Sequence, residues 1–129
     1  MNKKILIAGS VLGLLAVILG AFAAHGLENS ITKDAIETFQ TGVRYQMYHA
    51  IVLLFIGSTT LLSVKTKKWT YYLMLFGMIL FSGSIYGLST NELTSFDFKT
   101  IGFITPIGGL LLIISWLLML IGFKKIKSE

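Results

Sequence analysis

The chain has 129 residues, of which 54% are apolar and 13% charged, and its mean hydropathy is well above zero. This composition excludes an ordinary soluble domain and indicates a membrane protein. The absence of cysteine excludes disulfides and thiolate chemistry, and the meaning of the +5 net charge depends on where the lysines lie.

The first apolar stretch covers about residues 5–24 and is long enough to cross roughly 30 Å of hydrocarbon as a helix. Its basic start and the sequence Ala21-Phe22-Ala23 also fit a signal peptide with its cleavage site. The apolar stretch is longer than the usual core of such a peptide, so we expect it to be a retained membrane span.

The next segment has the pattern of an amphipathic helix. Apolar residues recur every four positions, at Ile31, Ala35, Phe39 and Val43. Polar and charged side chains lie mostly elsewhere on the helical wheel. Either Ser30 or Thr32 is expected to cap its start. The helix either lies on the outer membrane surface or runs directly into the second span.

Three further apolar stretches complete the predicted fold, at about residues 45–64, 69–88 and 101–123. Backbone groups in hydrocarbon must be satisfied within a helix, and short connections make consecutive helices antiparallel neighbours. We therefore expect one all-α domain over residues 1–129, built as a four-helix transmembrane bundle. The loop 89–100 shows no periodicity, and Thr105 before Pro106 predicts that the regular fourth helix begins there.

The basic residues predict the orientation of this bundle. Eight lysines fall on one side of the four spans: Lys3, Lys4, Lys65, Lys67, Lys68, Lys124, Lys125 and Lys127. By the positive-inside rule that side is cytoplasmic, and it holds both termini. The basic charge is then a topology signal with a secondary attraction to anionic lipid, and no nucleic-acid partner is expected.

Small residues predict where helices approach closely. The candidates for helix packing are Gly9, Gly13, Gly20, Gly83, Gly87, Gly108 and Gly109. Small side chains allow close backbone contact, which drives helix association in lipid. Packing within one chain is the first expectation, and some of these faces remain open for a homo-oligomer or a larger membrane complex.

Four sequence blocks resemble the signatures of a known family. They are LGAFAAHGL from Leu19, TGVRYQMYHA from Thr41, FSGSIY from Phe81 and TPIGG from Thr105. In this order they resemble the DUF423 family, which is similar to the eukaryotic transmembrane protein 256 group. Ala23 and Ser115 stand where glycine is expected, which affects packing rather than chemistry. The resemblance implies a small multi-pass protein of the bacterial cell membrane and supplies no reaction.

The two histidines give the candidate site. The first helix ends near His25, and His49 is placed about one turn into the second span, so both are expected at the outer rim. Gly42, Gln46, His49 and Leu53 share one helical face. The predicted cluster, a candidate ligand or interaction rim, consists of His25, Tyr45, Gln46, His49 and Tyr86.

The chemistry of this cluster leaves three functions open. Buried polar groups can simply fasten the helices, and two imidazoles without a third strong ligand favour neither a metal nor a haem. No catalytic motif is present, and no charged residue lies in the middle of a predicted span. The favoured prediction is a non-enzymatic accessory protein, without cofactor or metal, that packs with protein, lipid or quinone partners. The alternatives are an oligomeric channel or facilitator for a small solute, and a cofactor-binding or rim-site enzyme subunit using His49.

Overall fold

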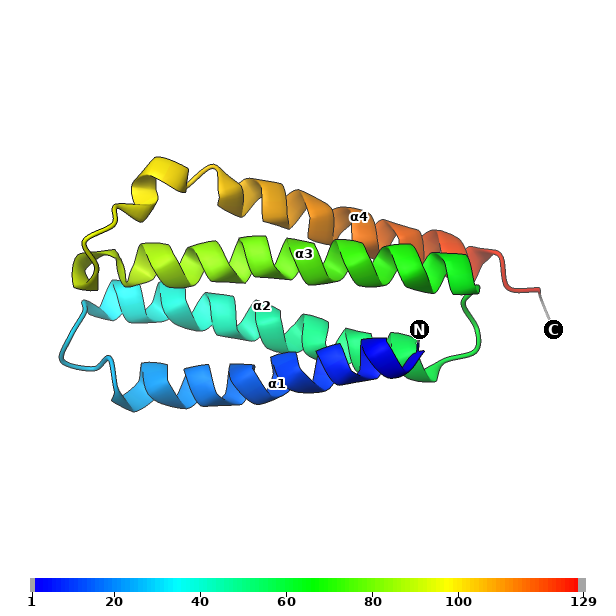
Figure 1. Cartoon of the computed structure of the whole chain (residues 1–129), viewed down its shortest axis with the longest axis horizontal. Helices are drawn as coiled ribbons and strands as arrows, with labels where there is room; N and C mark the ends of the chain where they lie inside the picture. Colours follow the sequence, from blue (N-terminus) through cyan, green and yellow to red (C-terminus); the bar gives the residue numbers. More distant parts are fainter. Residues whose placement is uncertain (1, 128–129) are drawn as a thin grey trace.

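The structure, a computed structural model, describes residues 2–127 and is built from helices. The α-helices are α1 (Asn2–His25), α2 (Lys33–Ser58), α3 (Val64–Ser89) and α4 (Ile104–Lys124). Two short 3₁₀ helices, η1 (Asn91–Leu93) and η2 (Phe98–Ile101), connect α3 to α4. The four long helices lie lengthwise beside one another in chain order (Figure 1). No strand occurs in residues 2–127, so the expected all-α class is confirmed.

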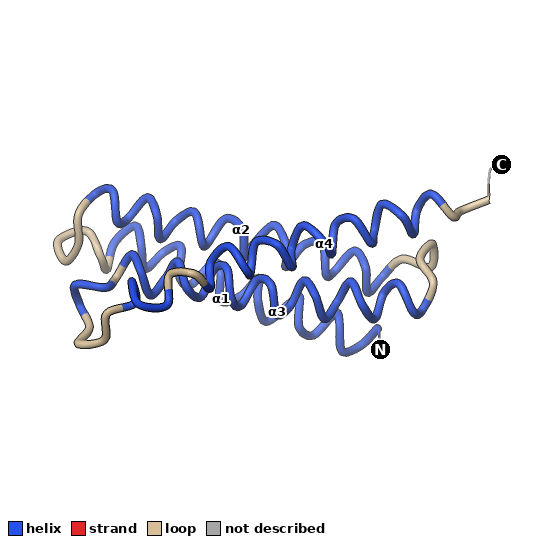
Figure 2. Tube along the Cα trace, turned by 90° about the horizontal axis from the view of Figure 1, so that it is seen from above, coloured by secondary structure: helices blue, strands red, loops and turns tan. Residues whose placement is uncertain are grey.

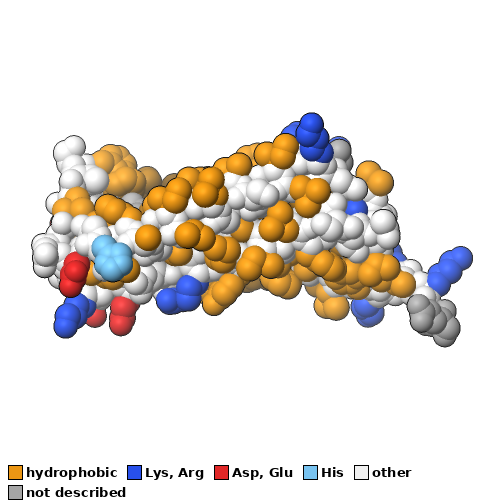
Figure 3. Space-filling model, turned by 90° about the horizontal axis from the view of Figure 1, so that it is seen from below, with side chains coloured by type: hydrophobic (Ala, Val, Ile, Leu, Met, Phe, Trp, Pro, Cys, Tyr) orange, Lys and Arg blue, Asp and Glu red, His pale blue; other side chains and the backbone are white. Residues whose placement is uncertain are grey.

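Three of these helices, α1, α3 and α4, are long and apolar enough to cross a membrane. Their outward faces carry large apolar side chains, among them Leu14 on α1, Phe76 on α3 and Ile113 on α4. Hydrophobic side chains extend along most of the molecular surface seen in Figure 3, whereas the acidic side chains on that face gather at one end. Such a surface is suited to lipid rather than water.

The helix α2 differs from the other three because its first half is polar. Lys33, Asp34, Glu37 and Arg44 all lie in that half, and α2 does not qualify as a span by length and composition. The amphipathic segment and the second apolar stretch form one continuous helix. Its start is capped by Thr32, whose Oγ1 accepts a hydrogen bond of 3.1 Å from the Ala35 amide.

The second apolar stretch ends earlier than the sequence indicated. The prediction placed it at about residues 45–64, but α2 ends at Ser58 with Thr59 as its C-cap, and residues 59–63 form the connection to α3. Leu61 and Leu62 are apolar and therefore extended the predicted span into what is a connection. By contrast, α4 begins at Ile104, one residue before the predicted Thr105.

The core contains buried side chains from all four long helices and from the α2–α3 connection. One cluster contains the buried residues Ile5, Leu53, Ile56, Leu62, Tyr71, Met74, Met78, Leu112 and Met119. A smaller cluster near the other end contains Ala23, Leu27 and Phe39. The closest packing joins consecutive helices, α1 to α2, α2 to α3, and α3 to α4.

Close helix contact is tightest where α3 and α4 cross. A Cβ added at Gly77 would lie 3.0 Å from the Gly108 carbonyl oxygen, and one at Gly108 would collide with the Phe81 backbone nitrogen. On the α1–α2 side, a Cβ at Gly9 would lie 3.0 Å from the Ala50 carbonyl oxygen. Glycine is required at these places because another backbone occupies the space of a side chain.

The remaining predicted glycines differ in what they meet. Gly13 and Gly20 face Ala50 and Val43 at ordinary contact distances, and Gly109 faces the ring of Phe81. Gly87 meets the ring of Phe98 in η2 rather than a long helix. Gly83 faces open space, with no atom within 4 Å of an added Cβ, so it does not hold two helices together as expected. The close contacts of Gly42, Gly57, Gly77 and Gly122 were not predicted.

The two ends of the bundle differ in charge. The start of α1, the connection between α2 and α3, and the end of α4 lie at the same end (Figures 1 and 2). That end carries Lys3, Lys4, Lys65, Lys67, Lys68, Lys124, Lys125 and Lys127. The opposite end carries Glu28, Asp34, Glu37, Glu92 and Asp97.

Candidate functional site

Gln46, in the middle of α2, links three helices. Its side-chain Nε2 donates to the Leu12 carbonyl oxygen of α1 at 2.8 Å. Its Oε1 accepts a hydrogen bond of 2.6 Å from the Tyr86 hydroxyl of α3. The side chain is 3% exposed, so both ends of the amide are satisfied inside the bundle.

Gly42 makes room for this link. A Cβ at Gly42 would lie 2.8 Å from a ring carbon of Tyr86, so the tyrosine ring occupies the space that a larger residue would fill. The neighbouring Ser82 hydroxyl donates to the Gly42 carbonyl oxygen at 2.8 Å. The ring of Phe39 packs against the ring of Tyr86, with ring centroids 4.7 Å apart. The Gln46–Tyr86 pair is therefore fixed by packing as well as by hydrogen bonds.

His49 lies one turn further along α2 and uses both ring nitrogens. Its Nδ1 is 2.6 Å from the Tyr45 carbonyl oxygen. Its Nε2 accepts a hydrogen bond of 3.1 Å from the indole Nε1–H of Trp116 on α4. Because a carbonyl oxygen only accepts and an indole N–H only donates, these partners require the neutral tautomer with the proton on Nδ1.

This tautomer limits the chemistry of His49. The nitrogen lone pair that would bind a metal or take up a proton is occupied by the Trp116 hydrogen bond. Within residues 2–127, no three His, Asp or Glu side chains are placed to share a metal ion. As arranged here, His49 and Trp116 join α2 to α4.

A groove opens beside this pair on the surface between α2 and α4. We call it the His49 groove, and its lining residues are Tyr45, His49, Phe81, Gly109, Leu112, Ile113 and Trp116. Its volume is about 460 Å³. Apart from the hydrogen-bonded His49–Trp116 pair and the Tyr45 hydroxyl, the lining is aliphatic or aromatic carbon. Gly109 has no side chain, so the wall of the groove is open at this position.

The structure brings four of the five predicted residues to one level and leaves the fifth apart. Gln46 contacts Tyr86, and His49 contacts Tyr45, within one turn of α2. His25 is the last residue of α1 and is exposed. At a helical rise of 1.5 Å per residue, it lies about 20 Å along α1 from Leu12, whose carbonyl oxygen Gln46 contacts. Within residues 2–127, His25 and His49 therefore do not lie together as expected.

The lengths of the helices give the position of the cluster along the bundle. His49 lies about 24 Å along α2 from Lys33 and about 14 Å from Ser58, by the same helical rise. Its partner Trp116 is likewise in the middle of α4. His49 and Trp116 therefore lie in the middle of their helices, whereas Tyr86 lies in the last turn of α3, and the rim position expected for the cluster stays a prediction.

Two residues of the site were not predicted. Trp116 provides the donor to His49, and Phe81 packs on Tyr45 with ring centroids 5.0 Å apart. A buried histidine in an apolar helix needs a donor or acceptor from another helix, and the fourth stretch offers the indole N–H of Trp116 beside the hydroxyls of Thr105 and Ser115. That requirement was the available signal, but sequence alone does not say which side of α4 faces α2.

The apolar surface, the long apolar helices and the polar links inside the bundle define a small multi-pass helical membrane protein. Residues 19–109 match the model of a family described as "protein of unknown function (DUF423)". The chain belongs to the DUF423 family. All four sequence blocks that suggested this family lie within the matched range.

Relatives of similar length occur in distant bacteria. A UPF0382 membrane protein of Staphylococcus saprophyticus is 41% identical, covering 96% of this chain and 99% of the relative. The UPF0382 membrane protein YwdK of Bacillus subtilis is also 41% identical, over 95% and 98% of the two chains. The UPF0382 inner membrane protein YgdD of Escherichia coli is 33% identical, over 99% and 95%. No solved structure matches. The chain is therefore a protein of the bacterial cell membrane.

Proposed function

We propose that all four helices cross the membrane as an antiparallel bundle. The contacts between α1 and α2 support this, because residue numbers fall along one helix as they rise along the other: Leu6 meets Gly57, Leu12 meets Gln46, and Gly20 meets Val43. The second half of α2 has exposed apolar side chains at Ile51 and Phe55, which suits contact with lipid. Its polar first half extends towards the end that carries the acidic residues.

The same bundle places the lysine-rich end in the cytoplasm. Eight described lysines lie there, against Lys33, Arg44 and Lys99 in the half of the molecule that carries the acidic residues. Since basic residues near span ends remain on the cytoplasmic side, both termini are assigned to the cytoplasm. The α1–α2 and α3–α4 connections then face outward.

The function that the geometry supports best is binding rather than catalysis. The protein acts as a non-enzymatic accessory protein that holds the apolar chain of a membrane lipid or quinone in the His49 groove. The main support for this proposal is that both ring nitrogens of His49 are hydrogen-bonded, to Tyr45 and to Trp116. The rest of the groove lining is mainly hydrocarbon. A groove of this kind offers contact area to an apolar chain and, apart from the Tyr45 hydroxyl, no free acid, base or nucleophile to a reaction.

Filling the groove tests this function. In Gly109→Phe the new side chain enters the groove wall, and the matched control Leu110→Phe changes a neighbouring exposed residue of α4 outside it. Both proteins are purified in mild detergent and their bound lipid and quinone are measured by native mass spectrometry. Wild type and Leu110→Phe should retain a bound molecule, and Gly109→Phe should lose it while keeping the helical circular dichroism of the wild type. Equal retention by all three would refute binding in the groove.

A further inference from the structure

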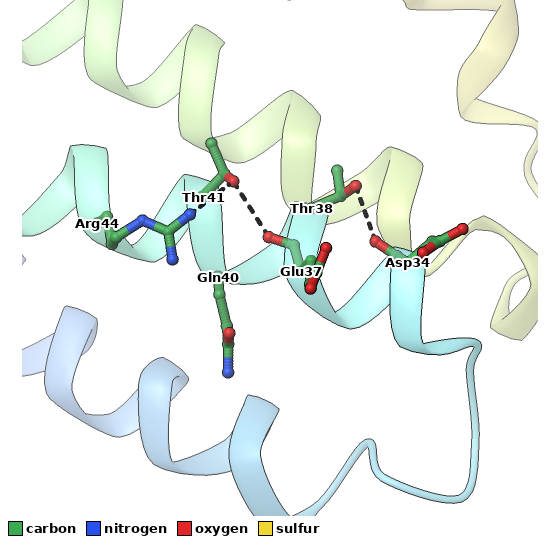
Figure 4. A pocket seen from close by; sticks show the side chains of 6 residues that line it. All are labelled: Asp34, Glu37, Thr38, Gln40, Thr41 and Arg44. Atoms are coloured by element: carbon green, nitrogen blue, oxygen red, sulfur yellow. Dashed lines mark hydrogen bonds between the residues drawn. The ribbon is translucent and has the colours of Figure 1, made fainter.

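The first half of α2 carries a polar concavity that is separate from the contacts described above. It is lined by Asp34, Glu37, Thr38, Gln40, Thr41 and Arg44 and has a volume of about 550 Å³. All six residues come from α2. Their side chains project from the side of α2 that lies between α1 and α3 (Figure 4). Both carboxylates and the guanidinium belong to exposed residues. We call this surface the α2 polar face.

The charges on the α2 polar face are held in a fixed order along the helix. Arg44 Nη2 donates to the Thr41 hydroxyl at 3.0 Å, and that hydroxyl donates to the Glu37 carbonyl oxygen at 3.1 Å (Figure 4). These bonds turn the guanidinium towards the start of α2. Asp34 and Glu37 lie further in the same direction, and among residues 2–127 their carboxylates have no hydrogen-bond donor or ion-pair partner.

The depth of these groups follows from the packing of α2 on α1. Val43, the neighbour of Arg44, contacts Gly20, which lies within the apolar stretch of α1. Glu37 lies about 10 Å further outward than Arg44 by the helical rise. The positive group therefore lies at the boundary of the hydrocarbon, and the two negative groups lie beyond it.

The α2 polar face leads directly into the His49 groove. Residues Thr38, Thr41, Tyr45 and His49 follow one another at intervals of three or four along α2, so they lie on adjoining faces of the helix. Tyr45 lines the groove, and Thr41 lines the polar concavity. A molecule with a polar end and an apolar chain can thus contact both surfaces at once.

We propose that the molecule bound here is a phospholipid with an ethanolamine head group, its phosphate on Arg44 and its ammonium on Glu37 and Asp34. This deepens the proposed function and rests on it, because the apolar chains would enter the His49 groove. In such a lipid the phosphate is next to the glycerol and the ammonium lies further from the hydrocarbon. That order, anion inside and cation outside, is the complement of a guanidinium below two carboxylates. Arginine pairs with phosphate oxygens and carboxylates accept from N–H groups, so both contacts are charge-assisted hydrogen bonds.

Other head groups match only part of this face. Phosphatidylglycerol provides the phosphate but no cation for the two carboxylates. Phosphatidylcholine provides a cation without N–H donors, so its ammonium cannot hydrogen-bond to Glu37 or Asp34. Comparison of the three lipids therefore separates recognition of an ethanolamine from simple attraction of charges.

The experiment is a competition between lipids for the intact protein. Delipidated protein in mild detergent receives equal amounts of phosphatidylethanolamine, phosphatidylcholine and phosphatidylglycerol with identical acyl chains, and bound lipid is counted by native mass spectrometry. The wild type should retain phosphatidylethanolamine about tenfold more than either competitor. Glu37→Gln and Asp34→Asn should remove that preference while lipid binding continues, and Arg44→Gln should weaken binding of all three lipids. Glu28→Gln and Lys33→Gln, which change exposed charges outside the concavity, should behave as the wild type.

The outcomes separate the head-group site from the groove. Equal retention of the three lipids, or a preference unchanged in Glu37→Gln, would overturn the ethanolamine site, whereas the groove is judged independently by Gly109→Phe. Equal retention of phosphatidylethanolamine and phosphatidylcholine would also overturn it, since hydrogen bonds from the ammonium are part of the proposal. Loss of all lipid from the wild type would overturn both the site and the proposed function.

Discussion

The Tyr86 hydroxyl donates to Gln46 Oε1 at 2.6 Å, and through this bond α3 is joined to an amide that also holds α1. The two residues are 40 positions apart in the chain, with Gln46 in the middle of α2 and Tyr86 in the last turn of α3. The link depends on Gly42, whose missing side chain leaves space for the tyrosine ring. Three helices are thereby fixed at one level, next to the groove formed with the fourth.

This link predicts a coupling energy between Gln46 and Tyr86. Tyr86→Phe leaves the Gln46 oxygen without its donor and should lower the free energy of unfolding by about 1 kcal/mol. Gln46→Leu should have a similar effect, and the double variant should cost less than the sum, since both substitutions remove the same bond. Thermal unfolding in detergent measures all three. Tyr48→Phe, at an exposed tyrosine of the same helix, is the control and should be nearly neutral. Additive single effects would show that the bond contributes nothing.

Glycine substitutions should separate by the space that each glycine faces. Gly108→Ala places a Cβ against the Phe81 backbone nitrogen, and overpacking of this kind costs about 1–3 kcal/mol. Gly83→Ala meets nothing within 4 Å and should be neutral or slightly stabilising, since alanine is the better helix former. Melting temperatures of the two variants check this directly. A Gly108→Ala protein as stable as Gly83→Ala would argue against the close α3–α4 contact.

The two histidines should behave independently. His49→Ala leaves the Trp116 indole without its acceptor and should destabilise the protein by about 1–2 kcal/mol. His25→Ala changes an exposed residue at the end of α1 and should alter stability by less than about 0.5 kcal/mol. Because the residues share no partner, the double variant should equal the sum of the singles. A clear deviation from additivity in detergent unfolding would mean that the histidines meet in the membrane.

The orientation is tested with two matched leucines. Leu61 lies in the α2–α3 connection and Leu93 in η1, and both are exposed. Since the natural chain has no cysteine, Leu61→Cys and Leu93→Cys each introduce a single thiol. An impermeant maleimide added outside intact bacterial cells (spheroplasts for species with an outer membrane) should label Leu93→Cys strongly, and Leu61→Cys only after the membrane is opened. The reverse pattern would place the lysine-rich end outside.

Much of this fold was predictable because membrane helices leave strong signals in sequence. The all-α class and the family followed from apolar stretches and short motifs, and Thr32, which caps α2, was one of the two residues predicted for that role. The shared buried face of Gly42, Gln46, His49 and Leu53 followed from helical spacing. These features depend on neighbours in the chain, so local sequence is sufficient to predict them.

The boundaries and rotations of the helices were not predictable in the same way. Apolar composition does not locate the end of a helix, so Leu61 and Leu62 were included in the predicted second span although they lie in the α2–α3 connection. The role of Trp116 depends on how α4 is rotated against α2, and the open space at Gly83 depends on how α3 is rotated. Rotations of this kind are set by packing between helices, which the periodicity of one helix does not determine.

The central claim is that the His49 groove holds an apolar membrane chain, and Trp116 in its wall can report it. The chain has two tryptophans, so Trp69→Phe leaves Trp116 as the one indole fluorophore. A phospholipid brominated along its acyl chain, which quenches indole on contact, is titrated into this protein in detergent. The groove predicts quenching that saturates at low lipid concentration and is lost when Gly109→Phe is added but not when Leu110→Phe is added. Quenching that rises without saturation and is the same in both variants would contradict a bound chain.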